Sequence, residues 1–301
     1  MAPSKSKYLL SGVLSAVIWG FFAIPLRNLK AYPSEQILYY RIFTSLIVIW
    51  LAILLFRRKE LKNDVVYFKQ SSRANKRIIL QQIIGATLLL VLNWYTFIYA
   101  INNVSIKSGA FAYMVCPLIT AFGGFIILKE HLYRIQIMAL ILATVSILML
   151  ATGSLIEVAW SVGIAALYAF YLIIQRKMQH LDKLNVLAVQ ISIAVILMMP
   201  FFIYQHTGLP VETSFWLNVV LIAVLFTVVP LFLSLFALIG IPSSTLGIII
   251  YINPIIAFTV AIFYFNEKID PHQLIAYLLL LFAVFLFNWN MIRDMLKFKR
   301  K

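Results

Sequence analysis

The chain has 301 residues, of which 63% are hydrophobic and 12% are charged, and its mean hydropathy is +0.97. Soluble domains are about half apolar and a quarter charged, so this composition excludes a soluble globular fold and predicts a polytopic membrane protein. The net charge of +15 would favour a nucleic-acid partner in a soluble protein, whereas here the positions of the basic residues indicate membrane topology.

Apolar runs of about 20 residues, each long enough for a helix to cross the bilayer, follow one another along the whole chain. Their hydrophobicity is continuous rather than alternating, and unpaired backbone is not tolerated in lipid, so only helices are expected. We predict an all-α polytopic membrane protein with ten transmembrane helices, at residues 8–26, 35–56, 78–101, 108–128, 135–152, 158–175, 185–204, 214–237, 243–265 and 272–292.

The basic residues orient these spans. Lys5 and Lys7 precede a long apolar stretch without a small-residue cleavage site, which predicts an uncleaved first span. With the N-terminus in the cytoplasm, 20 of the 25 Lys and Arg residues lie on the inner side and four on the outer, as the positive-inside rule requires. We therefore expect both termini in the cytoplasm of a multi-pass protein of the cell inner (plasma) membrane.

Two basic segments on the inner side, the loop at 57–77 and the tail from Arg293, are expected to contact anionic lipid. We expect no nucleic-acid partner. The bilayer itself and a small-molecule substrate are the predicted partners.

An internal repeat divides the chain. Residues 117–142 align without a gap with residues 254–279, and a further match links the first span to the sixth. Each half then holds five helices, and an odd number forces the second half to insert upside down relative to the first. We predict an inverted repeat of residues 1–152 and 153–301. The matched polar and proline pairs are Pro117 with Pro254, Glu130 with Glu267 and Gln136 with Gln273.

Five segments carry a resemblance to a known family: EQILYYRI at 35–42, LNWYTFIYAINN at 92–103, LYAFYLIIQRK at 167–177, TVVPLF at 227–232 and SSTLGIIIYINP at 243–254. In these segments the chain resembles the EamA-type permeases of the drug/metabolite transporter superfamily, and among them the RarD-like proteins. The resemblance implies ten helices, cytoplasmic termini and secondary transport or export of small metabolites.

Arg41 is the sharpest candidate for a functional residue, because it lies about two turns inside the second span, where an unpaired charge costs several kcal/mol. Its planar guanidinium suits bidentate binding of a carboxylate or phosphate. The alternative is structural: the side chain reaches outward to lipid headgroups, or it bonds helix-end carbonyls, Tyr39 or Tyr40.

Other candidates are polar or aromatic groups within spans, which either contact a solute or pack against neighbouring helices. Prolines in the fourth and ninth spans either free backbone carbonyls toward a cavity or simply kink the helix. The candidate substrate-binding residues besides Arg41 are Tyr40, Trp19, Asn93, Trp94, Tyr113, Tyr168, Tyr171, Gln190, Tyr251 and Asn253, and the candidate gating or kink residues are Pro117 and Pro254.

The sequence has no metal-ligand spacing, phosphate loop or catalytic motif, so we expect no metal, no cofactor, no catalytic residues and no enzymatic activity. The predicted function is secondary transport of a small polar metabolite, such as an amino acid or small carboxylate, by alternating access, with export or exchange as the mode. Two alternatives stay open: a membrane-embedded enzyme acting on a lipid or lipid-linked substrate, and an inert or regulatory bundle. A polar midplane cavity would favour the transporter.

Overall fold

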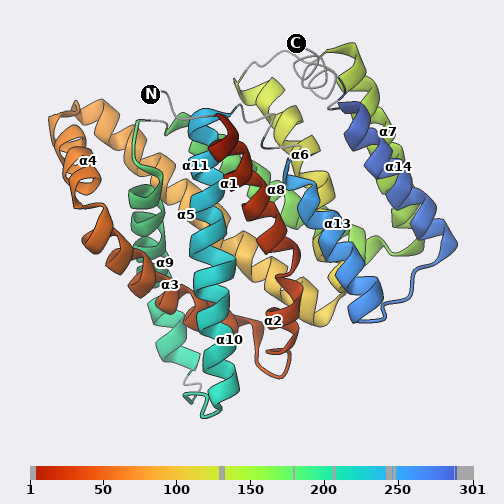
Figure 1. The fold of residues 1–301 in the computed structure, drawn as a ribbon, viewed down its shortest axis with the longest axis horizontal. Coiled ribbons are helices and arrows are strands. Elements are labelled where there is room, and N and C mark those ends of the chain that lie inside the picture. The colour runs from red at the N-terminus through yellow and green to blue at the C-terminus, as the bar shows by residue number, and fades with distance from the viewer. Residues whose placement is uncertain are drawn as a thin grey trace.

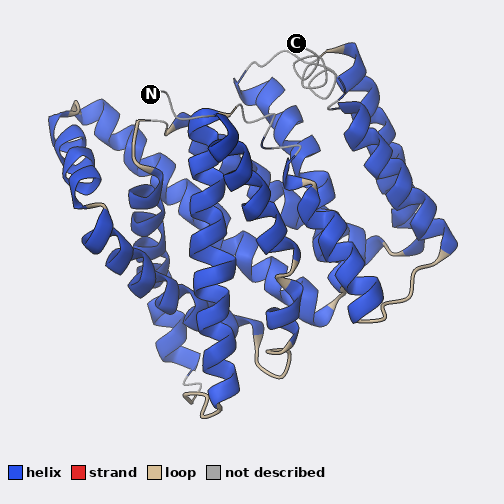
Figure 2. Ribbon diagram, in the orientation of Figure 1, coloured by secondary structure: helices blue, strands red, loops and turns tan. Residues whose placement is uncertain are grey.

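The computed structural model describes residues 5–128, 133–178, 180–205, 208–241, 246, 249–287 and 289. Within these ranges every regular element is a helix, and short loops join the helices (Figure 2). The expected all-α fold is therefore confirmed for this part of the chain. The Glu130 turn and the basic tail from Arg293 lie outside the described residues.

The N-terminal part of the chain forms seven helices. The first predicted span is divided into a long and a short helix by a break at Phe21 and Phe22. The helices are α1 (Lys5–Gly20), α2 (Ala23–Arg27), α3 (Ser34–Phe56), α4 (Arg58–Gln70), α5 (Arg73–Asn103), α6 (Ile106–Leu128) and α7 (Arg134–Gly153).

The C-terminal part contains helices of two kinds, since two five-residue stretches have π-helical geometry. The elements are α8 (Leu155–Lys177), α9 (Lys183–Gln205), α10 (Thr213–Ala223), the π segment η1 (Val224–Val228), α11 (Val229–Gly240), α13 (Ile252–Thr259), the π segment η2 (Val260–Tyr264) and α14 (Pro271–Phe287).

Seven helical segments of the described chain are long and apolar enough to cross a membrane, and three further apolar helices are shorter. These ten segments overlap the ten predicted spans. One expectation needs correction: the 57–77 region, treated as a loop, contains helix α4. Its Arg, Lys, Glu and Leu residues are good helix formers, and it lacks Gly and Pro; Ser72 then caps α5 by accepting a hydrogen bond from the Asn75 amide.

The helices pack as a bundle with one peripheral pair. Helices α7 and α14 lie side by side at one edge (Figure 1). Helix α1 packs against α11 and α13, α8 packs against α5 and α6, and α3 packs against α9. The α1–α13 contact is close at Gly20, where a Cβ would lie 2.6 Å from the Cβ of Ile256.

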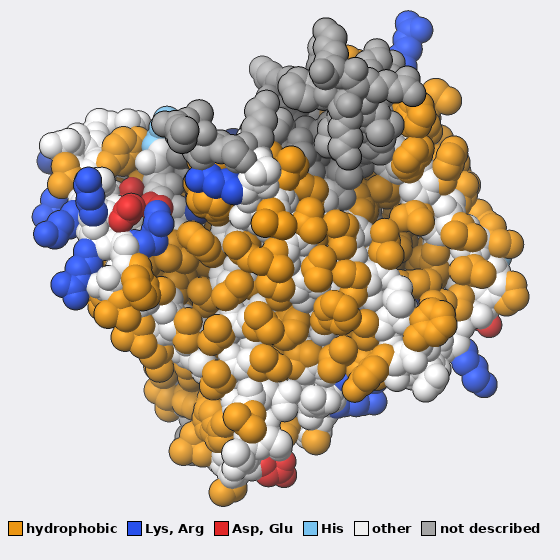
Figure 3. All heavy atoms as spheres, in the orientation of Figure 1, with side chains coloured by type: hydrophobic (Ala, Val, Ile, Leu, Met, Phe, Trp, Pro, Cys, Tyr) orange, Lys and Arg blue, Asp and Glu red, His pale blue; other side chains and the backbone are white. Residues whose placement is uncertain are grey.

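The surface matches a protein that lives in a bilayer. Figure 3 shows hydrophobic side chains over the middle of the visible face, Lys and Arg over α4 at the upper left, and further charges along the lower rim. Large apolar side chains such as Leu51, Leu55 and Phe56 of α3 are exposed, as lipid contact allows. We call the two ends of the bundle the α4 end and the Glu267 end.

Candidate functional site

Arg41 lies in the interior of the bundle, with only 2% of its surface exposed. Its Nε donates a 2.8 Å hydrogen bond to the Thr227 hydroxyl. Its guanidinium carbon lies 4.3 Å from the ring centroid of Trp94 and 5.0 Å from that of Phe22, so two aromatic faces attract the cation. Among the described residues, no carboxylate forms an ion pair with it.

The partner of Arg41 is positioned by the π segment η1. A π turn widens the helix, and the Thr227 hydroxyl donates to the Ile222 carbonyl five residues earlier at 2.9 Å. Its oxygen is then directed at Arg41. Such π segments often mark functional sites.

Pro230, three residues after Thr227, completes this construction. Proline has no N–H, so it cannot bond the carbonyl of Phe226 four residues before it. That carbonyl instead accepts a 3.1 Å hydrogen bond from the indole N–H of Trp19 in α1. The Pro230 carbonyl in turn accepts from Ser15 of α1 at 2.8 Å. A single proline thus fixes α1 against the helix that carries Thr227.

Aromatic side chains from several helices surround this centre. The Tyr168 ring packs edge-on against Trp19 and Tyr113 at centroid distances of 6.4 and 6.2 Å, and it stacks on Tyr171 at 5.7 Å. Tyr113 also interacts electrostatically with Arg41. We call Trp19, Arg41, Trp94, Tyr113, Tyr168 and Thr227 the central cluster.

Several buried polar atoms near this cluster have no hydrogen-bond partner among the described residues. They include Nη1 of Arg41, the Tyr171 and Tyr251 hydroxyls and both side-chain amide atoms of Asn253. Cys116 lies one helical turn after Tyr113 on α6, and α6 packs against both α8, which carries Tyr168, and α13, which follows Tyr251. Buried polar groups are nearly always bonded, so these atoms are the candidate contacts for a polar ligand.

Three other candidates have different surroundings. Tyr40 points away from the central cluster although it precedes Arg41, because adjacent residues of a helix point about 100° apart. Its ring packs edge-on against the rings of Phe43, Phe202, Phe215 and Trp216. Asn93 donates to the Ile164 carbonyl of α8 at 2.9 Å, and Gln190 accepts from Gln175 at 3.1 Å. Asn93 and Gln190 thus make the helix-to-helix bonds that were the structural alternative.

The two prolines differ in their settings. Pro117 lies within α6, which stays helical from Ile106 to Leu128. Pro254 lies in the first turn of α13, directly after a turn at Tyr251. A proline is tolerated in a first helical turn because the missing N–H has no intrahelical partner there. The ninth predicted span, 243–265, is therefore not one continuous helix, because a turn at Tyr251 precedes α13.

The α4 end holds a second polar network, which joins the two parts of the chain. The Arg57 guanidinium forms a 2.6 Å ion pair with Asp182. The carboxylate of Asp64 accepts from the backbone N–H of Asp182 at 3.1 Å and from the Asn185 amide at 2.6 Å. Burial is the largest effect on Asp64 and raises the pKa of its carboxyl. The network fixes α4 against the start of α9.

Two cavities lined by described residues lie elsewhere. One, of about 500 Å³, is an apolar crevice between α6 and α7 lined by Phe122, Phe125 and Ile141 among others; a much smaller one lies near Ser108 and Gln273. The described chain has no cluster of three or more His, Cys, Asp or Glu that could hold a metal ion.

Thr227 is not among the predicted site residues, because one hydroxyl in a long apolar run carries no pattern; its signals are Pro230 and its place at the start of the TVVPLF segment, 227–232. We expect Thr227→Val, which preserves shape and removes the acceptor for Arg41, to weaken ligand binding about 3- to 10-fold, the effect of a lost charge-assisted bond of about 1 kcal/mol. Titration of the purified variant checks this. Thr96→Val is the matched control, since Thr96 bonds only carbonyls of its own helix, and it should bind as the parent does.

Comparison with known proteins agrees with this architecture. The model of the EamA-like transporter family matches residues 6–152 and 155–289. The chain is 26% identical to the protein RarD of Streptomyces exfoliatus over 291 residues, which cover 95% of this chain and 89% of that protein. It is also 26% identical to RarD of Escherichia coli over 294 residues, covering 94% and 95%.

An uncharacterized transporter of Pseudomonas aeruginosa is 26% identical over 289 residues, or 94% of both chains. A solved crystal structure of a protein that is 14% identical superposes with a TM-score of 0.66 and covers 95% of this chain and 98% of the other. That likeness supports the fold. The expected resemblance to EamA-type, RarD-like permeases is confirmed.

Proposed function

Because this chain belongs to the EamA-like transporter family and is a multi-pass membrane transporter, we propose that it carries a small anionic or zwitterionic metabolite, such as an amino acid or small carboxylate. Alternating access around the central cluster is the proposed mechanism, with export or exchange as the mode. The buried guanidinium of Arg41, which has no carboxylate partner among the described residues, carries this proposal.

The electrostatics of Arg41 favour an anionic group on the substrate. A buried cation without a counter-ion costs several kcal/mol; cation–π contacts, worth about 2 kcal/mol or more each when desolvated, offset part of that cost, but they leave the charge without a counter-ion. The Nη1 donor of Arg41 has no hydrogen-bond partner among the described residues. A carboxylate would satisfy that donor and neutralise the charge together, while the rings of Trp19, Tyr113 and Tyr168 would pack around the rest of the solute.

The proposed architecture is ten spans in two inverted halves, residues 1–152 and 153–301. The packing supports it, because exchanging the halves maps one set of helix contacts onto another. Helix α8 on α6 corresponds to α1 on α13, and α8 on α5 corresponds to α1 on α11; α3 with α9 and α7 with α14 are self-equivalent pairs. The two matched family segments divide the chain in the same place.

The proposed topology places the α4 end in the cytoplasm, together with both termini, in the cell inner (plasma) membrane. Helix α4 is exposed along its length and carries Arg58, Lys59, Lys62 and Lys69. A basic amphipathic helix beside a span suits contact with anionic lipid. The described neighbours of Arg41 include no paired acid and base of the kind that an enzyme requires, which favours transport over catalysis.

The test is the thermal stability of the detergent-purified parent protein against amino acids, organic acids, nucleosides, cationic drugs and lipids. A ligand at 100 times its dissociation constant adds about 2.7 kcal/mol, so we expect a raised melting temperature with at least one carboxylate or zwitterion. Counterflow of that compound in proteoliposomes then measures transport. Stabilisation by cations or lipids alone would contradict the proposed substrate class.

A further inference from the structure

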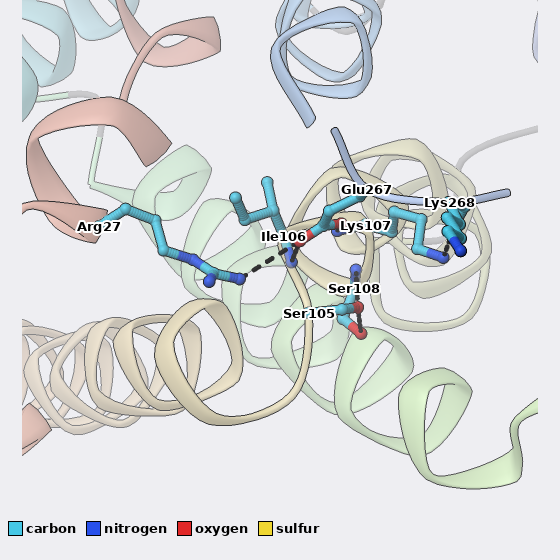
Figure 4. Close-up of polar contacts among 7 residues, drawn as sticks. All are labelled: Arg27, Ser105, Ile106, Lys107, Ser108, Glu267 and Lys268. Atoms are coloured by element: carbon cyan, nitrogen blue, oxygen red, sulfur yellow. Dashed lines mark hydrogen bonds and ion pairs between the residues drawn. The ribbon is translucent and has the colours of Figure 1, made fainter. Parts of the chain in front are cut away.

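Glu267 joins three separate segments at the end of the bundle opposite α4. Its Oε1 accepts from Arg27 of α2 at 3.2 Å and from the Ile106 backbone N–H at 3.1 Å, and its Oε2 accepts from the Lys107 backbone N–H at 3.3 Å. Figure 4 shows this carboxylate between the Arg27 side chain and the start of α6. One side chain thus links α2, α6 and the turn between α13 and α14.

The backbone around Glu267 holds the carboxylate in place. The π segment η2 ends α13, and Asn266 adopts a left-handed conformation with a φ of 53°, which asparagine tolerates better than most residues. The Glu267 N–H then bonds the Ala261 carbonyl six residues earlier at 3.0 Å, a closure one residue wider than the 6→1 bond of a Schellman motif, because the helix ends in the π segment η2. The turn is therefore a rigid end of α13 and moves with that helix.

The electrostatics make this contact stronger than a surface ion pair. The first N–H groups of α6 carry the positive end of the helix dipole, and they are donors without an intrahelical partner. Arg27 and Glu267 are only 21% and 16% exposed at their side chains. Lys107 strengthens the same junction, since its Nζ donates to the Lys268 carbonyl at 2.7 Å and to Gln273 of α14 at 3.3 Å.

The helices joined at this point also carry the central cluster. Helix α6 bears Tyr113 and Cys116, and α13 follows directly on Tyr251. In the described state α6 and α13 pack together, so access from the Glu267 end to the cluster requires the α13 end to separate from the α6 start. That separation breaks the hydrogen bonds that the Glu267 carboxylate accepts from the Ile106 and Lys107 backbone N–H groups, while the hydrogen bond from Arg27 ties the same carboxylate to α2.

We propose that Glu267 is the gate at this end of the transporter: its seated carboxylate keeps the central cluster closed to this side, and its release from Arg27 and the α6 N-terminus opens it. The gate rests on the proposed alternating-access function. In the structure the Glu267 carboxylate is bound to Arg27 and to the α6 N-terminus, which the proposal assigns to the state closed at this end.

The chain contains a single cysteine whose chemical modification can report access to the central cluster. This residue, Cys116, is buried and lies one helical turn after Tyr113 of the central cluster on α6. A small membrane-impermeant anionic methanethiosulfonate therefore reports access to the cluster from one side. The reagent is added to intact cells and separately to inside-out vesicles, so that each face is probed alone, and Cys116→Ser gives the background.

We expect Glu267→Gln to speed Cys116 modification at least about tenfold when the reagent is on the side that the Glu267 end faces. This factor corresponds to about 1.4 kcal/mol of lost free energy of closing. With the reagent on the other side, the rate should be no faster than in the parent. Arg27→Gln, which keeps the α6 contacts of Glu267, should give a smaller increase. Glu212→Gln is the matched control, since this exposed carboxylate at the start of α10 bonds Ser214 and interacts with Tyr32, away from α6 and α13, and it should modify as the parent does.

If Cys116 were modified at the parent rate in folded Glu267→Gln and Arg27→Gln proteins, the gate proposal would be wrong and the Glu267 contact would have a structural role only. Faster modification from both sides would also overturn it, because it would indicate general loosening of the bundle. The readout needs no substrate. A failed search for a carboxylate ligand would therefore contradict the substrate proposal and leave this result standing.

Discussion

Arg41→Gln should lose carboxylate binding by at least about 30-fold, and transport of the same compound should fall with it. Removing one partner of a buried charge pair costs about 2 kcal/mol or more, and glutamine cannot replace the charge. Arg41→Lys should give an intermediate loss, because it keeps the charge and lacks the planar fork. Ligand titration by thermal shift and counterflow in proteoliposomes measure both quantities.

The stability of the empty protein separates a binding role from a structural one. A buried cation without a counter-ion destabilises the empty protein, because its desolvation is not offset. Arg41→Gln without ligand should therefore melt at the parent temperature or above it. Lys30→Gln removes the same charge from an exposed loop position and should bind ligand normally. If Arg41→Gln melted well below the parent and still bound carboxylate, Arg41 would be a structural residue.

Gly20→Ala should destabilise the protein by about 1–3 kcal/mol, the usual cost of overpacking. The added methyl would lie 2.6 Å from Cβ and 2.7 Å from Cγ2 of Ile256. The Cβ is fixed to the α13 backbone and a β-branched side chain has little χ1 freedom in a helix, so α1 and α13 must separate. The melting temperature should drop by several degrees, at about 2–4 °C per kcal/mol for a large domain. Intrinsic tryptophan fluorescence in detergent follows the transition.

Gly163→Ala is the matched control for that change. Gly163 lies inside α8, and a Cβ there would meet nothing within 4 Å. Because alanine favours a helix interior by roughly 0.5–1 kcal/mol over glycine, this variant should melt at or slightly above the parent temperature. Equal melting temperatures for the two alanine variants would show that the α1–α13 contact is not tight.

Most of the fold can be predicted from hydrophobicity, since a run such as 183–205 leaves a helix as its only form in lipid. The interruptions are harder to predict. A proline follows each of them, Pro25 after the break at Phe21 and Phe22 and Pro254 after the turn at Tyr251, but a proline in an apolar run does not itself say whether the helix kinks or ends. Helix α4 is not predicted from hydrophobicity, because it has no long apolar run. Only the helix propensity of its Arg, Lys, Glu and Leu residues indicates a helix there.

For the candidate site, the sequence identifies some of the residues that the structure brings together. Arg41 was identifiable because a guanidinium inside an apolar span demands a partner, and the aromatic residues Trp19, Tyr113 and Tyr168 indeed lie near it. Thr227 could not be identified, because its role depends on a π segment that has no hydrophobic signature. In the sequence, Glu267 stands out only because it matches Glu130 in the internal repeat. The sequence does not show that the turn after the ninth span contacts the start of the fourth span.

The π segment η1 has a consequence for how this sequence tolerates length changes. A π turn holds one residue more than the α turn it replaces, as a single-residue insertion in an ancestral α-helix would leave it. Deleting one residue between Val224 and Thr227 would let the helix return to α geometry. Because the widened turn absorbs the extra residue, α10 and α11 would keep their orientation about the helix axis, whereas the same deletion in a regular α-helix would rotate them by about 100° relative to each other. A one-residue deletion here should therefore preserve the packing of α10 and α11 and remove the widened turn that carries Thr227, the partner of Arg41.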